Sequence, residues 1–169
     1  MVERRRCGED DKEKMKWAIP PKIKIYEALG CLGDERIREE NSKIHVYSSS
    51  GNKFYVVKYS ENENAIVTND NGSFWKGYLG YPAIAYLMKI GKITFDRKFA
   101  SALRGIKWKD INQKFKNDFV KTEKLIRKDL VLKEINLREI DMEIENILEQ
   151  IRKLDLNLLG EKIRPPGGY

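Results

Sequence analysis

The chain has 169 residues, of which 41% are hydrophobic and 35% charged, and its formal net charge is +7. It can therefore bury a core, and it lacks the composition of a disordered polyelectrolyte. No stretch approaches the roughly 20 apolar residues that span a bilayer, the start has no secretory signal, and two cysteines give no disulfide framework. These features predict a cytoplasmic, non-membrane protein of one domain, with or without a helical appendage.

The N-terminal part divides at a pair of prolines. Residues 1–19 mix both charges with few apolar anchors, so we expect a flexible charged leader. Pro20 and Pro21 end this leader, because paired prolines resist helix formation. The following segment, KIKIYEALGCLG, has apolar residues at helical spacing and glycines that can stop a helix. It predicts a short helix at the start of a core domain that spans residues 20–129.

Residues 34–70 change to a pattern of short strands and turns. Four segments are rich in β-branched and aromatic residues, namely RIREE, KIHVYS, KFYVVKYS and NAIVTN. Asparagine, serine, glycine and glutamate separate them in short connections that are typical of turns. Because connections this short favour hairpins, the pattern predicts a four-stranded antiparallel meander.

The part of the chain after the meander is expected to be helical. GSFWKGYLGY is aromatic and punctuated by glycine, which indicates a loop or a short irregular strand. AIAYLMKI predicts a helix with Pro82 in its first turn and Gly91 at its end. Residues 96–103 predict another short helix, and a longer basic helix is expected from Lys109 to about Lys128.

Residues 130–159 carry the most regular pattern of the chain. Apolar residues alternate at three- and four-residue spacings on an otherwise charged helix, with Lys133 as the one polar interruption. The stripe can pack on the domain's own core, or it can bind a second copy or a partner protein. The candidate interface residues are Ile140, Ile144, Ile147, Ile151 and Leu154. Residues 160–169 are expected to form a disordered tail.

Together these elements predict an α+β fold. It has a short N-terminal helix, a four-stranded antiparallel β-meander, and a helical C-terminal half that ends in a long amphipathic helix. We find no internal repeat that would suggest a solenoid or an array.

The sequence shows no recognisable constellation for catalysis or metal binding. His45 is the only histidine, and it lies in a predicted strand, while the two cysteines form no CxxC motif. The glycines lack the context of a P-loop or a dinucleotide fingerprint, and the serines at 48–50 lack a G-x-S-x-G elbow. We therefore predict no metal, no cofactor and no enzymatic activity, with an unfamiliar enzyme as the alternative.

The order of elements from Asp34 to Ile90 resembles the SWIM domain, a zinc-binding module of β-hairpins, CxC, linker, CxH and helix. The matching parts are KIHVY, the turn SSSGNK, FYVVKY, AIVTND, the aromatic-glycine linker and PAIAYLM. The ligand pairs would fall near residues 66–69 and at Tyr81 and Ala83, where this chain has neither cysteine nor histidine. The resemblance therefore implies a degenerate, metal-free module, and SWIM roles in DNA handling and protein interaction favour a binding function.

The basic excess is concentrated in one segment, residues 75–121, which we call the basic window. It holds eleven basic and three acidic residues, whereas residues 122–159 hold seven and nine. Lysines that neutralise phosphates release counterions, and exposed aromatic rings stack on bases. The basic window therefore predicts binding of DNA or RNA without sequence specificity.

Nine residues of the basic window are the candidates for this role. The predicted phosphate contacts are Lys76, Arg104, Lys107, Lys109, Lys114 and Lys116, and the predicted stacking residues are Trp75, Tyr78 and Trp108. One alternative is that the aromatic residues belong to the core and the lysines to a solvated face. Another is that the protein is an interaction or assembly adaptor that works through its C-terminal helix.

Overall fold

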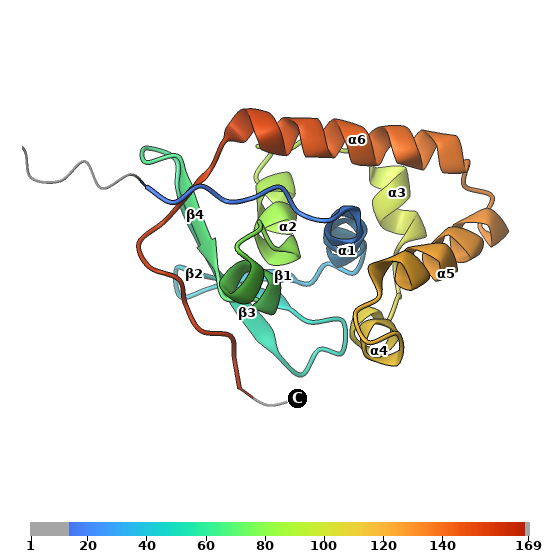
Figure 1. The fold of residues 1–169 in the computed structure, drawn as a ribbon, viewed down its shortest axis with the longest axis horizontal. Helices are drawn as coiled ribbons and strands as arrows, with labels where there is room; N and C mark the ends of the chain where they lie inside the picture. Colours follow the sequence, from blue (N-terminus) through green and yellow to red (C-terminus); the bar gives the residue numbers. More distant parts are fainter. Residues whose placement is uncertain (1–13, 168–169) are drawn as a thin grey trace, which may run out of the picture.

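The computed structural model describes residues 14–167 and confirms the α+β fold (Figure 1). An N-terminal helix precedes an antiparallel meander, and the helical C-terminal half has a long final helix, as predicted. In chain order the elements are α1 (Lys22–Gly33), β1 (Ile37–Glu40), β2 (Lys43–Tyr47), β3 (Phe54–Ser60), β4 (Ala65–Thr68), the π-helical turn η1 (Gly72–Lys76), α2 (Tyr81–Lys89), α3 (Arg97–Ala102), α4 (Trp108–Lys114), α5 (Phe119–Leu132), α6 (Leu137–Leu154) and β5 (Asn157–Leu158). No helix in the described part is both long and apolar enough to cross a lipid bilayer.

Helix α1 lies in the middle of the core, where α2, α3, α5 and α6 all contact it. Its apolar residues are buried on more than one side, since Ile23, Ile25 and Leu29 are at most 2% exposed. Its small residues allow close packing. A Cβ atom at Gly33 would lie 2.1 Å from the carbonyl oxygen of Ala100, so α3 approaches α1 at a distance that only glycine permits.

The sheet contains five strands in the order β1-β2-β3-β4-β5. The first four form the predicted meander, in which neighbouring strands are antiparallel. Asn41 and Ser42, which connect β1 to β2, have φ angles of 50° and 62°, as a tight two-residue hairpin requires. Strand β5 pairs with β4 in parallel and was not predicted, because two residues are too few to show a strand pattern.

Residues 14–19 differ from the expected flexible leader, because they pack against the domain. Trp17 is 9% exposed, and its Nε1 donates a hydrogen bond of 2.8 Å to the carbonyl oxygen of Ile66. One aromatic side chain supplies the apolar anchor that the dense charges of this segment obscure. The rest of the predicted leader, residues 1–13, lies outside the described part of the chain.

Residues 160–167 also differ from the expected disordered tail. Ile163 packs against the hydrophobic core, and Lys162 Nζ donates a hydrogen bond of 3.2 Å to the carbonyl oxygen of Phe74. The tail therefore lies beside η1 over this stretch. Residues 168–169 lie outside the described part.

The basic helix predicted from Lys109 to about Lys128 is two helices, α4 and α5. The chain turns between them, where Lys116 and Asn117 have φ angles of 50° and 61°. Asp118 begins α5, since its carboxylate accepts a hydrogen bond from the backbone N–H of Lys121 at 3.3 Å. The apolar residues Phe115 and Phe119 lie on both sides of this turn, so hydrophobic spacing alone did not reveal it.

The segment 130–159 is likewise interrupted. Helix α5 ends at Leu132, α6 begins at Leu137, and the chain leaves the helix after Leu154 to form β5. Glu134 has a φ angle of 60° in the connection. The side chain of Asn136 then caps α6, because its Oδ1 accepts a hydrogen bond of 2.9 Å from the backbone N–H of Arg138.

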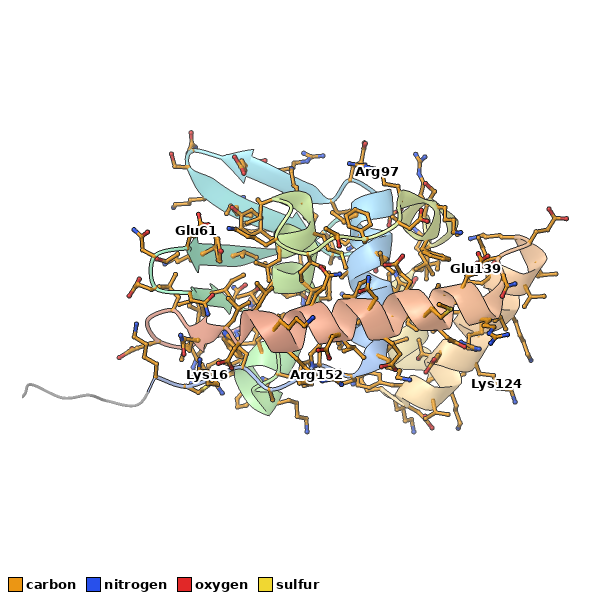
Figure 2. The ribbon with its side chains drawn as sticks, turned by 90° about the horizontal axis from the view of Figure 1, so that it is seen from above. Lys16, Glu61, Arg97, Lys124, Glu139 and Arg152 are labelled. Carbon is orange, nitrogen blue, oxygen red and sulfur yellow. The ribbon has the colours of Figure 1, made fainter. Side chains whose placement is uncertain are left out.

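The apolar stripe of α6 packs on the chain's own core. The side chains of Ile140, Ile144, Ile147 and Ile151 are at most 5% exposed, and Leu154 packs against the same core. Figure 2 looks onto the outer face of α6, where charged side chains such as Glu139 and Arg152 project instead. Because the stripe is buried by α1 and its neighbours, these five residues present no apolar face to a partner in this conformation.

Candidate functional site

A pocket of about 730 Å³ opens between the β2–β3 turn, the segment around η1, and helices α1 and α4. Helix α4 and the β2–β3 turn lie on the side of the molecule away from α6, and α1 lies between α4 and α6 (Figure 1). The pocket is rich in positive charge, since six basic side chains and two acidic ones line it. The basic ones are Lys24, Arg36, Lys53, Lys76, Lys109 and Lys116, and the acidic ones are Glu27 and Asp70. Its volume falls within the usual range of small-ligand sites.

The rim of the pocket is aromatic and basic. Trp75 is 68% exposed, although it is one of the largest apolar side chains of the protein. Lys76, Lys109 and Lys116 come from η1, from α4 and from the turn after α4. None of these three lysines forms an ion pair with a residue in the range 14–167. Within the described part of the chain, the rim therefore offers three lysines without ion pairs and one exposed aromatic ring, which contacts Phe74 edge to face.

A buried polar cluster holds the turn that presents Trp75 and Lys76. The carboxylate of Asp70 accepts hydrogen bonds from the backbone N–H and the hydroxyl of Ser73, at 3.2 and 2.6 Å. The Ser73 hydroxyl in turn accepts one from the backbone N–H of Gly80 at 3.0 Å. Burial raises the pKa of Asp70, although the bonds from Ser73 act in the opposite direction. Turns of the π type occur often at functional sites.

The floor of the pocket contains a nearly buried ion pair. Lys24 Nζ lies 3.2 Å from Glu27 Oε2, and the two side chains are 14% and 3% exposed. Burial is the largest single influence and lowers the pKa of Lys24, but the charges of Glu27, Tyr78 and Asp70 and the hydrogen bond to Glu27 together outweigh it, so the pKa lies above its ordinary value. Glu27 Oε1 also accepts a hydrogen bond of 2.8 Å from Asn112, which ties α1 to α4.

Arg36 also lies in the floor, with a side chain that is 10% exposed. Its Nη1 donates a hydrogen bond of 2.7 Å to the carbonyl oxygen of Tyr47, and its Nε lies 3.3 Å from a carboxylate oxygen of Asp34. The guanidinium carbon is 5.8 Å from the ring centre of Tyr81. Burial raises the pKa of Tyr81 well above its ordinary value, so this phenol stays neutral.

Helix α4 is fixed to the rest of the pocket at its first residues. The backbone N–H of Lys109 donates a hydrogen bond of 3.1 Å to the hydroxyl of Ser49 in the β2–β3 turn. Trp108 is only 4% exposed, and a Cβ atom at Gly30 would lie 2.8 Å from its Nε1. Trp108 is thus packed on α1 as part of the core, and of the predicted stacking tryptophans only Trp75 is exposed.

The structure brings six of the nine predicted residues together in this pocket: Trp75, Lys76, Tyr78, Trp108, Lys109 and Lys116. Arg104, Lys107 and Lys114 are exposed but do not line it. Lys24, Arg36 and Lys53 line the pocket and were missed, because they lie before the basic window and carry no local signal. Among the described residues, no group of three or more His, Cys, Asp or Glu is placed to hold a metal ion.

The comparison with protein families matches residues 17–157 to the uncharacterised conserved protein family UCP014422. The match covers most of the chain, so the chain belongs to this family. No curated protein and no solved structure matches it. The resemblance to the SWIM domain therefore stays a prediction.

Proposed function

We propose that this member of the UCP014422 family binds single-stranded nucleic acid in the basic pocket. The observation that carries the proposal is the exposed ring of Trp75 in the same pocket as three lysines that form no ion pair within residues 14–167. Phosphates next to these lysines gain free energy by releasing condensed counterions. A base stacked on Trp75 adds about 1–3 kcal/mol.

The arrangement of the three lysines supports a role beyond solubility. Lys76 ends η1, Lys109 lies in α4 and Lys116 lies in the turn after α4, so separate parts of the chain converge on one rim. A face that serves only solubility normally mixes both signs of charge. Here the two acids of the pocket, Glu27 and Asp70, are buried and hydrogen-bonded within the protein, so they leave the rim positive.

The aromatic ring favours single strands over duplexes. Bases inside a duplex are already stacked and paired, whereas unpaired bases can lie on an aromatic side chain. The site is also a concave pocket of about 730 Å³ rather than a flat face, which suits one or two splayed nucleotides better than a rigid double helix. We place no restriction on DNA or RNA.

The test is fluorescence anisotropy of labelled single-stranded and duplex DNA and RNA, titrated with the full chain at several salt concentrations. We expect the single strands to bind more tightly, with an affinity that falls steeply as salt rises. A triple variant with Lys76→Gln, Lys109→Gln and Lys116→Gln should weaken binding and reduce the magnitude of the salt slope by about 2.

A matched control replaces three lysines that are exposed but lie outside the pocket, with Lys43→Gln, Lys58→Gln and Lys153→Gln. It changes the net charge by the same amount, so it should retain most of the affinity. Equal losses in the two triple variants would show that only the overall charge matters. Absence of binding at low salt would refute the proposal.

A further inference from the structure

The floor of the pocket holds a further cation, Arg36, in addition to the three lysines of the rim. The Arg36 side chain lines the pocket and is nine-tenths buried, with 10% exposure. Its Nη1 is used by the carbonyl oxygen of Tyr47, and its Nε lies near Asp34. Its Nη2 is buried and has no acceptor at hydrogen-bond geometry among residues 14–167. Burial by itself lowers the pKa of Arg36, whereas the nearby Tyr81 hydroxyl acts as a side-chain hydrogen-bond partner that raises it.

A buried guanidinium N–H without an acceptor costs free energy, and the cost is larger for a charged group than for a neutral one. Native proteins satisfy nearly all such groups. An oxyanion that enters the pocket would supply the missing acceptor, and the planar fork of arginine matches the oxygens of a phosphate especially well. The unsatisfied side of Arg36 thus points to an anionic ligand.

Arg36 is paired with Asp34 through its Nε, whereas the two carboxylates that line the pocket have other partners. Glu27 is paired with Lys24 and accepts a hydrogen bond from Asn112. Asp70 is occupied by Ser73. Neither carboxylate therefore needs the guanidinium of Arg36 as a partner.

Additional donors line the same pocket on the side of the β2–β3 turn. Lys53 comes from this turn, and Lys109 lies in the first turn of α4, where its backbone N–H is hydrogen-bonded to Ser49 of the same β2–β3 turn. The hydroxyl-bearing residues Ser48 and Tyr55 line the pocket as well. A group with several anionic oxygens would meet both positive charge and hydroxyl groups here.

We propose that the floor binds the terminal phosphate of a nucleotide, as a phosphomonoester at the end of a strand or on a free mononucleotide. The inference rests on the proposed function, because the base of that nucleotide would use the aromatic rim. A phosphate inside a strand continues into sugars on both sides, whereas a terminal phosphate has one free side, so we expect the terminal group to approach Arg36, whose side chain is only 10% exposed, more easily. The pocket would therefore select strand ends.

The experiment uses the full chain and oligonucleotides of one sequence with a 5′-phosphate, a 3′-phosphate, or hydroxyls at both ends. We expect one phosphorylated form to bind about tenfold more tightly than the hydroxyl form at the same salt concentration. Adenosine 5′-monophosphate and adenosine serve as competitors. The nucleotide should displace the phosphorylated strand, and the nucleoside should do so far less well.

Two variants test the arginine itself. Arg36→Gln removes the charge and should abolish the preference for a phosphorylated end, while Arg36→Lys keeps the charge but loses the planar fork and should retain only part of it. Arg38→Gln is the matched control, because Arg38 lies on the same segment but is exposed and outside the pocket. Thermal unfolding shows whether each variant folds, and the wild-type comparison of strand ends does not depend on any variant.

The outcomes separate this inference from the proposed function. Equal affinity of the wild-type protein for phosphorylated and hydroxyl ends would overturn the inference and leave single-strand binding in place. Binding of the mononucleotide without binding of any oligonucleotide would support the phosphate site and refute the proposed function. Failure of every strand and of the mononucleotide would overturn both.

Discussion

Helix α6 and helix α4, which lines part of the basic pocket, lie at opposite edges of the molecule in Figure 1, and the charges of α6 and of the pocket rim have different surroundings. On α6, acids are paired with cations from other segments. Glu139 lies 3.0 Å from Lys98, and Glu145 lies 3.0 Å from Lys22. At the rim of the pocket, Lys76, Lys109 and Lys116 have no such partner among the described residues.

The difference shows that the number of charges on a surface is a poorer guide to ligand binding than the presence or absence of an ion-pair partner for each charge. Exposed ion pairs contribute only about 0–1 kcal/mol each, so those of α6 mainly balance the surface above a buried apolar stripe. The rim of the pocket instead holds three lysines without a carboxylate partner among the described residues, beside an exposed tryptophan, whereas the cations of the floor are paired. We therefore expect substitutions beneath α6 to affect stability and substitutions at the rim to affect binding.

The largest effect should come from a charge placed beneath α6. Ile144 is 2% exposed, so Ile144→Asp would bury an unpaired carboxylate and should reduce the free energy of unfolding by about 4 kcal/mol or more. Met142 is 67% exposed on the same helix, so Met142→Asp should change it by about 0.5 kcal/mol or less. Urea unfolding of both variants measures this, and similar losses would mean that α6 does not pack as described.

The tryptophans allow the same comparison within the basic window. Trp108 is 4% exposed, so Trp108→Ala should reduce the free energy of unfolding by about 3–5 kcal/mol. Trp75 is 68% exposed, so Trp75→Ala should leave stability nearly unchanged and weaken single-strand binding by about 1–3 kcal/mol. Thermal unfolding and anisotropy distinguish the two effects. Unchanged affinity in Trp75→Ala would remove stacking from the proposed function.

The smallest predicted effect is a loss of stability at alkaline pH that arises from Tyr26 in the buried helix α1. Tyr26 is 1% exposed and burial raises its pKa from 10.0 to about 12, although a hydrogen bond from Arg127 acts in the opposite direction. The folded state holds this proton more tightly than the unfolded state does. Its contribution to stability is therefore full below pH 10 and is lost as the pH rises toward 12. Stability measured across this window should fall less in Tyr26→Phe than in the wild type, and identical slopes would contradict the assignment.

Local patterns were sufficient for the elements whose geometry depends on neighbouring residues. The meander follows from short strands and from turn residues such as Asn41 and Ser42, because a hairpin is closed by the two residues between its strands. Pro82 in the first turn of α2 is a similar local signal. The basic window was also visible, since counting charges requires no contacts.

The breaks in the helices were not visible from spacing. Apolar residues continue at helical intervals on both sides of residues 115–118 and 133–136, because each helix must cover the same core. Caps such as Asp118 and Asn136 mark the new helices, but aspartate and asparagine also occur inside helices. Local composition therefore could not show where one predicted helix divides into two.

The sequence by itself determined the fold class, the meander and the position of the positive charge, because these depend on composition and on short-range periodicity. Only the tertiary structure decided which groups became buried or free. Trp108 is buried because Gly30, far away in the chain, leaves room for it, while Trp75 stays 68% exposed. Arg36 likewise lines the pocket together with residues that are distant from it in the sequence. Burial and pairing depend on residues that folding brings together, and no local pattern encodes those distances.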